Sequence, residues 1–281
     1  MNRTLAAEFA EFASDTLPIT PAPDEATYKR LWLDLRSREP LDVAFAGGAI
    51  ADRLAWVFAA AYQAAMRACF DGARDDAWIA LCASEDRTGE FPGVQLKGGT
   101  LSGSKSWVAG SATLDQMIVT IGRSPRNGCW LLDCDAPGVE VVQLPRKKFL
   151  GDLSQGAVNL TRVAADHQVN VSRADHFGIA EPFFVVVAAL PYLLREARRL
   201  NQSMEADLQA IADDIDPIYQ AGFHTDIAAV LAVQQRCAAA GKALAALAGE
   251  PDAGPGFDWA ADGRLLGMYG RGLRARLDQA S

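Results

Sequence analysis

The sequence predicts an α+β fold in which helices at both ends flank a central β-region. Residues 77–170 contain short apolar runs separated by turn residues, whereas apolar residues on either side of that segment recur at helical spacing. The chain has 281 residues, 50% of them hydrophobic, which is enough for a sizeable core. We therefore predict an N-terminal helical domain (1–76), a middle antiparallel β-barrel or sandwich (77–170) and a C-terminal four-helix bundle (171–281).

The N-terminal region is predicted to be entirely helical. Residues 4–15 form a short helix, which a proline-rich stretch ends. Asp24 can cap a second helix that runs to about Arg36. Residues 41–70 are rich in alanine, with large apolar residues at helical spacing, and predict one long core helix.

The middle region changes to strands. Turn signals such as Gly98-Gly99 and Pro137-Gly138 divide it into short segments, which is typical of an antiparallel barrel or sandwich. The predicted strands are 78–83, 94–96, 104–109, 116–121, 129–133, 139–143 and 157–163.

The C-terminal region returns to helical spacing, and its helices predict a bundle. Asp175 can cap the first helix, and a second runs from Met204 to about Ala212. A long alanine-rich helix is predicted over 218–247, and a final helix over 258–277. A loop with two prolines separates these last two helices.

Residues 101–115, which read LSGSKSWVAGSATLD, contain the most informative pattern in the chain. Strict alternation in a strand places Trp107 on one face together with Lys105 and Ala109. A tryptophan fixed on a sheet can form a stacking wall for a flat ligand. The residue type alone favours ordinary core packing, because most aromatic side chains pack in cores.

This stretch resembles the middle-domain motif of the acyl-CoA dehydrogenase family, roughly L-N/S-G-T-K-x-W-I-T/S-N-G. Residues 81–85 (LCASE) are similar to the family strand that ends in T-E-P, and residues 129–141 (CWLLDCDAPGVEV) to F-L-V-x-x-D-T-P-G-V-x-V. The three motifs occur in the family's order. The resemblance implies a flavin-dependent oxidoreductase that dehydrogenates an acyl thioester between its α and β carbons.

The resemblance also implies which residues would contact FAD. Trp107 would lie against the isoalloxazine, and Ala109 replaces a Thr or Ser that hydrogen-bonds the flavin, so only its backbone could serve. The strand that ends in LCASE would contribute Leu81, Ala83 and Ser84. The family's G-S-D turn is absent, since the chain continues as DRTGEFPG over residues 86–93.

A catalytic carboxylate is harder to place from the sequence. The family commonly has a glutamate before its last helix, in a motif such as Y-E-G-T, and the chain has no glutamate in residues 256–262. Asp258 is the nearest substitute and Asp262 the second, although a helix cap is the more common role for an aspartate at either position. Some family members use a glutamate in the first bundle helix, which corresponds to a position near Glu181.

Two other functions stay open at this stage. Ala109, the absent G-S-D turn and the absent glutamate favour a non-catalytic member that acts as a binding or assembly subunit. A flavin monooxygenase on the same scaffold is the other alternative, because fold alone does not decide function.

Composition argues against several partners. The net charge of −8 is unfavourable for nucleic-acid binding, and five cysteines without C-x-x-C spacing and three histidines make a zinc site unexpected. No run of about twenty uncharged apolar residues is found, so we expect no membrane span. We expect a cytoplasmic protein, and the resemblance implies a homodimer formed through the C-terminal helices.

Overall fold

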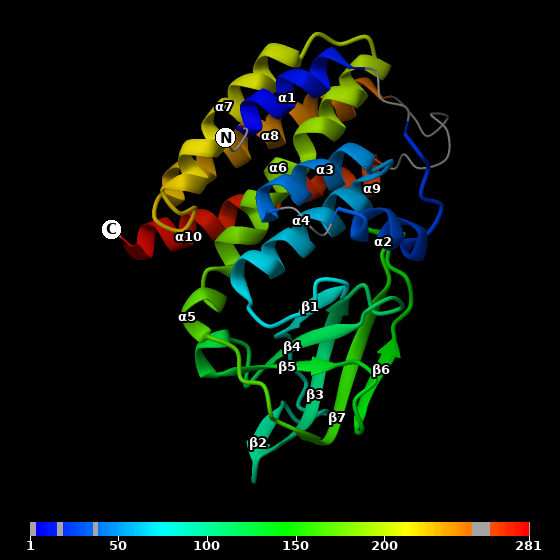
Figure 1. Cartoon of the computed structure of the whole chain (residues 1–281), viewed down its shortest axis with the longest axis vertical. Helices are drawn as coiled ribbons and strands as arrows, with labels where there is room; N and C mark the ends of the chain where they lie inside the picture. Colours follow the sequence, from blue (N-terminus) through cyan, green and yellow to red (C-terminus); the bar gives the residue numbers. More distant parts are fainter. Residues whose placement is uncertain (1–3, 16–18, 36–38, 249–258, 281) are drawn as a thin grey trace.

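The computed structural model describes residues 4–15, 19–35, 39–248 and 259–280. Helices occupy one end of the molecule and two β-sheets the other, as Figure 1 shows. The N-terminal helices are α1 (Leu5–Ser14), α2 (Glu25–Leu33), α3 (Pro40–Ile50) and α4 (Leu54–Cys69).

Local signals explain where these helices begin and end. Asp24 accepts a hydrogen bond from the backbone N–H of Thr27, which confirms the predicted cap of α2. The single helix predicted over 41–70 is wrong, because the chain leaves the helical conformation between α3 and α4. Asp52 lies in that break, where its carboxylate accepts from the backbone N–H of Ala22 and pairs with Arg53. An aspartate that bonds backbone groups in this way competes with helix formation.

The strands form two sheets rather than a closed barrel. In the described part of the chain, one sheet has the order β1-β4-β5 and the other β2-β3-β7-β6. The prediction of a wholly antiparallel region is also wrong, since β1 and β4 run parallel. The strands are β1 (Ile79–Cys82), β2 (Gln95–Lys97), β3 (Thr100–Ala109), β4 (Gln116–Thr120), β5 (Cys129–Asp133), β6 (Val139–Gln143) and β7 (Gln155–Ala164).

A bulge in β3 interrupts the predicted alternation around Trp107. Lys105 pairs with Val158 and Val108 pairs with Gly156, so β3 has one more residue than β7 between these pairs. Lys105 and Val108 are both fully buried, while Trp107 is half-buried. The bulge therefore separates Trp107 from the buried face that Lys105 occupies, which strict alternation could not predict.

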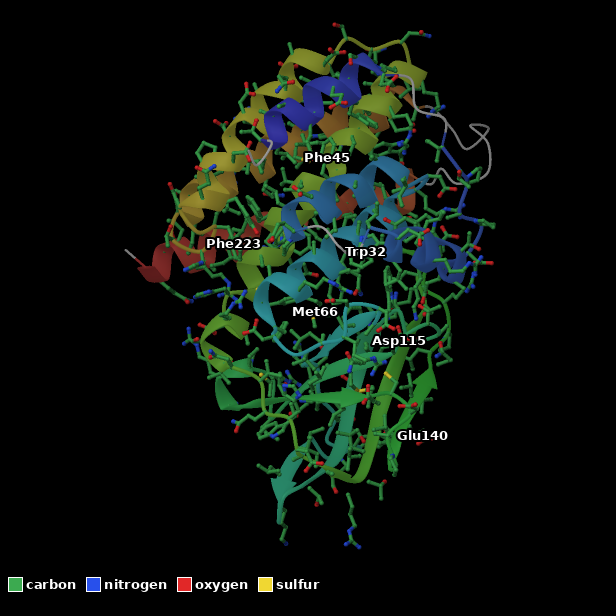
Figure 2. The ribbon with its side chains drawn as sticks, in the orientation of Figure 1. Trp32, Phe45, Met66, Asp115, Glu140 and Phe223 are labelled. Atoms are coloured by element: carbon green, nitrogen blue, oxygen red, sulfur yellow. The ribbon has the colours of Figure 1, made fainter. Side chains whose placement is uncertain are left out.

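Helices from both ends of the chain pack into one helical body. The second half contributes α5 (Val171–Ala174), α6 (Phe177–Arg199), α7 (Glu205–Gln220), α8 (Ile227–Leu247), α9 (Trp259–Asp262), the 3-10 helix Gly263–Leu266 and α10 (Gly270–Ala280). The long helix α6 packs against α3 and α4 as well as against α8. Helix α1 lies beside α7, where Gln209 donates to the carbonyl oxygen of Ala6 (Figure 1). Trp32, Phe45, Met66 and Phe223 belong to the core of this body (Figure 2).

Three helix boundaries in this half differ from the prediction. Helix α7 continues through Pro217, next to the buried residues Ile215 and Ile218. Helix α8 begins only after Asp226, whose side chain accepts from the N–H of Ala229. The last helix begins at Gly270, twelve residues after the position that the sequence predicted.

Helix α6 is long and apolar enough to cross a membrane by length and composition alone. In this fold, 89% of its most apolar window is buried against other parts of the protein. It has the features of the core helix of a helical body, and its apolar character is explained by that packing.

A buried carboxylate joins the helices to the sheets. Glu25, in α2, is 7% exposed and accepts from the backbone N–H and the hydroxyl of Ser154 and from the hydroxyl of Thr113. Ser154 precedes β7 and Thr113 follows β3, so the contact fixes the end of both strands against the helical body. Trp107 and Gln155 lie near this end of the two strands.

Candidate functional site

A cavity of about 480 Å³ lies beside Trp107. Trp107 forms a bridge with Ser84, and its indole N–H donates to the side-chain oxygen of Gln155 at 3.0 Å. These contacts hold the half-buried ring in the wall of an open space. The lining residues are Ala83, Ser84, Glu85, Asp86, Arg87, Ser106, Trp107, Arg123 and Lys147.

Three of the lining residues are exposed cations, namely Arg87, Arg123 and Lys147. The two acidic residues in the lining are already engaged. Glu85 accepts from the buried ammonium of Lys105 at 2.8 Å, and Asp86 accepts from the backbone N–H groups of Thr88, Glu90 and Phe91. The cavity therefore presents available positive charge, which suits an anionic group such as a phosphate.

Asp86 organises the loop that replaces the G-S-D turn. Hydrogen bonds from the hydroxyl and the backbone N–H of Thr88 are the main cause of its lowered pKa. The Asp86 carboxylate therefore stays ionised and holds the loop closed, and it is poorly suited to accept a proton. A loop folded on its own aspartate needs no glycine-serine pair to form its turn.

The structure brings three of the five predicted cofactor residues to this cavity. Ala83, Ser84 and Trp107 line it. Leu81 is not among the lining residues, and its backbone N–H donates to the hydroxyl of Tyr62 at 2.8 Å. Ala109 is buried beside Gln155 in the sheet and is also absent from the lining.

Glu181 and two tyrosines form a second group of titratable side chains in the helical body. Glu181 lies in the first turns of α6, and loss of water contacts raises the pKa of its carboxyl group to about 7. Burial and then the charge of Glu181 raise the pKa of Tyr62. Tyr62 connects this group to the strand that reaches the cavity, through its bond to Leu81.

Tyr269 is the third member of this group. Burial and then the charge of the neighbouring Glu181 raise the pKa of its hydroxyl. Because the last helix begins at Gly270, the loop before it ends with Tyr269. Tyr269-Gly270 therefore lies at the start of the last helix, and it is similar to the first two residues of the Y-E-G-T motif with glycine in place of glutamate. The sequence alone missed this match, since it began the last helix at Asp258.

The two aspartates predicted as bases have different outcomes. Asp262 is buried, and its carboxylate accepts from the backbone N–H of Leu150 at 2.6 Å. This bond ties the end of α9 to the loop before β7. Asp258 lies outside the described residues.

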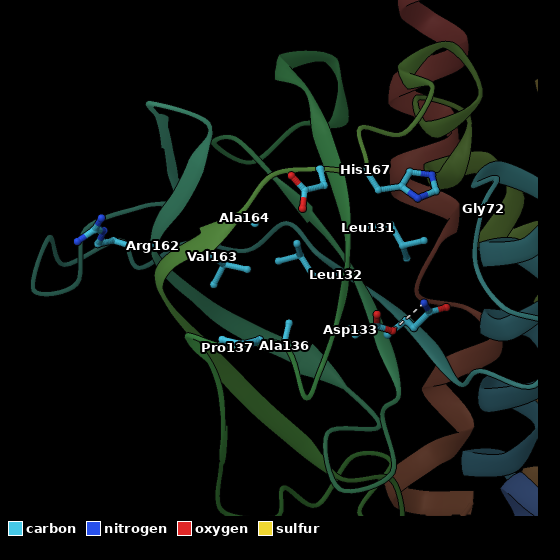
Figure 3. A pocket seen from close by; sticks show the side chains of 12 residues that line it. Gly72, Leu131, Leu132, Asp133, Ala136, Pro137, Arg162, Val163, Ala164 and His167 are labelled. Carbon is cyan, nitrogen blue, oxygen red and sulfur yellow. Dashed lines mark hydrogen bonds between the residues drawn. The ribbon is translucent and has the colours of Figure 1, made fainter.

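A second cavity, of about 490 Å³, lies elsewhere on the β-region (Figure 3). Leu131, Leu132 and Val163 belong to its lining, and Gln116 donates to Asp133 at 2.9 Å at one side. Figure 3 shows Arg162 lying apart from the other lining side chains.

Across the described residues, no group of three or more His, Cys, Asp or Glu side chains could hold a metal ion. The cavity beside Trp107 is the stronger candidate because it combines an aromatic wall with available cations.

No protein-family model matches this chain, and no curated protein matches it in sequence. Solved structures do match. FkbI, described as acting in biosynthesis of a methoxymalonyl extender unit, has a TM-score of 0.65 at 16% identity, over 98% of this chain and 96% of that one. The structure described as PigA with FAD and proline has a TM-score of 0.64 at 12% identity, over 99% of this chain and 97% of that one. Butyryl-CoA dehydrogenase from Megasphaera elsdenii has a TM-score of 0.62 at 12% identity, over 97% of this chain and 98% of that one.

These likenesses show the fold. The chain has an acyl-CoA dehydrogenase-like fold over nearly its whole length, as the motifs around Trp107 implied. The mixed helical and β architecture predicted from the sequence is confirmed at that level.

Proposed function

We propose that this chain is a flavin-dependent oxidoreductase that acts on an acyl thioester. The observation that carries the proposal is the half-buried Trp107 ring in the wall of a cavity of about 480 Å³. A core tryptophan would be sealed, whereas this one borders open space in a fold shared with a structure described as containing FAD.

The residues present fit a flavin dinucleotide. Trp107 supplies an aromatic face, Ser84 and Ser106 supply hydroxyls, and the lining cations complement a pyrophosphate. A bound FAD would supply the hydride-accepting redox chemistry that the dehydrogenation needs. The protein's part is then to hold the ring system, exclude water and remove a substrate proton.

Glu181 is the side chain that we propose accepts the proton from the α-carbon of the thioester. A carboxylate whose pKa is near 7 is ionised in part at neutral pH and is a stronger base than an ordinary glutamate. Asp262 is less suited, because its carboxylate is buried against the backbone N–H of Leu150. Gly270 has no side chain, so the position next to Tyr269 supplies no carboxylate.

Absorption spectroscopy of the purified protein tests the flavin proposal. We expect flavin bands in the visible range, or their appearance upon titration with FAD. Replacing Trp107 with alanine is expected to weaken FAD binding by about 5- to 150-fold, since stacking on an aromatic ring contributes ~1–3 kcal/mol. Trp107→Phe retains a ring and should lose less. A colourless protein that takes up no FAD would contradict the proposal.

Variants of Asp262 separate a structural role from a catalytic one. Asp262→Ala leaves the buried N–H of Leu150 without an acceptor and is expected to reduce the free energy of unfolding by ~1–3 kcal/mol. Asp262→Asn keeps an acceptor and should retain most stability and turnover of an acyl thioester. Denaturant unfolding and a steady-state assay measure both. Loss of turnover in Asp262→Asn at unchanged stability would identify Asp262 as the base instead.

A binding or assembly subunit is the second candidate function. The absence of Ala109 from the cavity lining and the aspartate-centred loop at residues 86–93 favour it, because both depart from the motif that holds flavin. Bound flavin that bleaches upon addition of an acyl thioester would exclude this alternative. Oxygen consumption with one oxygen atom incorporated into the substrate would indicate a monooxygenase. A cytoplasmic homodimer formed through the helices remains part of the proposal.

A further inference from the structure

The outer strand of the four-stranded sheet has an open edge. β6 pairs with β7 on one side and with no described strand on the other, and it lies at the outside of the sheet in Figure 1. The carbonyl oxygen of Gly138 accepts from β7 and the N–H of Leu144 donates to it, each at 2.8 Å. Backbone groups alternate in direction along an antiparallel ladder, so those of Val141 and Gln143 point away from β7. They are free to bond another strand.

This edge is apolar and carries little charge. Three of its five residues are valines, of which Val142 is 38% exposed. Glu140 is the single charged residue of the strand, and Figure 2 shows it at the outside of the molecule. An open apolar edge pairs readily with a further strand unless charges, prolines or bulges block it. The prolines here, Pro137 and Pro145, flank β6 and leave its five residues able to pair.

Opposite charges occur at the two ends of β6. Asp135 lies in the turn before the strand, and Arg146 and Lys148 lie in the loop after it. All three side chains are exposed, and none forms an ion pair with a residue that the structure describes. Antiparallel pairing of a strand with its own copy sets the start of each against the end of the other, so acidic turn meets basic loop twice. This attraction offsets part of the repulsion between two chains whose net charge is −8.

We propose that β6 pairs with the β6 strand of a second copy of this chain, in an antiparallel contact with two-fold symmetry. A register centred on Val141 places this residue opposite its own counterpart. The same register places Glu140 opposite Val142, so like charges do not face each other across the strands. The contact lies on the β-region and does not depend on the flavin proposal. Together with a dimer formed through the helices, it gives a tetramer.

Sedimentation of the full chain over a concentration series tests this contact. We expect the mass of the smallest species to double as concentration rises, and the association to weaken at high salt. Val141→Pro removes an N–H that points away from β7, so it should abolish the doubling and leave the fold, FAD content and turnover unchanged. Circular dichroism checks the fold of the variant. A wild-type mass that does not change with concentration would overturn the inference.

Charge variants test the register. Asp135→Lys should weaken the association about tenfold, since an exposed ion pair contributes ~0.2–1 kcal/mol and the reversed charge adds repulsion at both ends. Asp135→Lys/Arg146→Glu/Lys148→Glu exchanges the charges of the two ends and should restore the association. Failure of this exchange to restore it would contradict the antiparallel register.

Cysteine cross-linking tests the geometry. Glu140 and Val142 of the two copies would form non-hydrogen-bonded pairs, with Cα atoms about 4.5 Å apart and therefore within disulfide range. Mild oxidation of Glu140→Cys/Val142→Cys should give a covalent dimer. Gln95→Cys/Lys97→Cys is the matched control, at exposed positions of the opposite edge strand β2, and should stay unlinked. Equal linking of both variants, an association that Val141→Pro leaves intact, or open-ended polymers would overturn the inference even in an active flavoprotein.

Discussion

Replacing Glu181 with glutamine is expected to reduce turnover of an acyl thioester by about 10²- to 10⁴-fold, the usual contribution of a general base. Glutamine has nearly the same size but cannot accept the proton. Flavin content should remain normal, because Glu181 is not among the residues that line the cavity beside Trp107. Rapid-reaction measurement of flavin reduction distinguishes loss of the base from loss of the cofactor.

The pH dependence provides an independent check on Glu181. Loss of water contacts raises the pKa of its carboxyl group above the unfolded value, to about 7. The folded protein therefore retains a proton that the unfolded chain releases between about pH 4.5 and 7, so this group makes the fold less stable as pH rises through that window. Activity should follow the opposite course and rise with pH through about 7, as the base becomes ionised.

Two further variants test the neighbourhood of Glu181. Tyr269 lowers the pKa of Glu181, so Tyr269→Phe should move the rising limb of the pH profile to higher pH. A Cβ atom at Gly270 would lie 3.3 Å from Oε1 of Gln234, so Gly270→Glu requires that side chain to shift by a few tenths of an ångström. Activity recovered in Glu181→Gln/Gly270→Glu would show that the site accepts a base from either element. Full activity in Glu181→Gln alone would exclude Glu181 as the base.

Replacing Lys105 with methionine is expected to reduce the free energy of unfolding by ~3–5 kcal/mol, the cost of removing one partner of a buried ion pair. Lys105 is 0% exposed, and its ammonium donates to Glu85, to the hydroxyl of Thr120 and to the carbonyl oxygen of Gly122. Methionine fills a similar volume but donates a hydrogen bond to none of these oxygens. Denaturant unfolding followed by circular dichroism measures the change.

A double variant determines whether the loss comes from the unpaired carboxylate. Glu85→Leu/Lys105→Met removes both charges and should be clearly more stable than Lys105→Met alone. Thr120→Val removes a single neutral partner and should cost less, about 1 kcal/mol. Equal stability of the single and double variants would mean that the three acceptors of Lys105 contribute little and that packing dominates.

The sequence by itself was sufficient for the order of the helical and β regions and for the likeness to the acyl-CoA dehydrogenase fold, but not for the pairing of the strands. Helical spacing and short apolar runs are local patterns, so they predict helix, strand and helix wherever the chain is regular. The motif around Trp107 added the family resemblance. Asp24 as the cap of α2 was also predictable, because a cap acts on a residue only three positions away.

Only the tertiary structure decided how the site is assembled. The bulge in β3 removes Trp107 from the buried face of Lys105, and it depends on pairing with β7 some fifty residues later. Tyr62 and Glu181 come from the helices α4 and α6 and Tyr269 from the turn before α10, and no sequence spacing connects them. Their grouping and the raised pKa of Glu181 follow from packing of α6 between helices of both halves. Burial and long-range contacts are properties of the folded chain, so local patterns in the sequence could not predict this grouping.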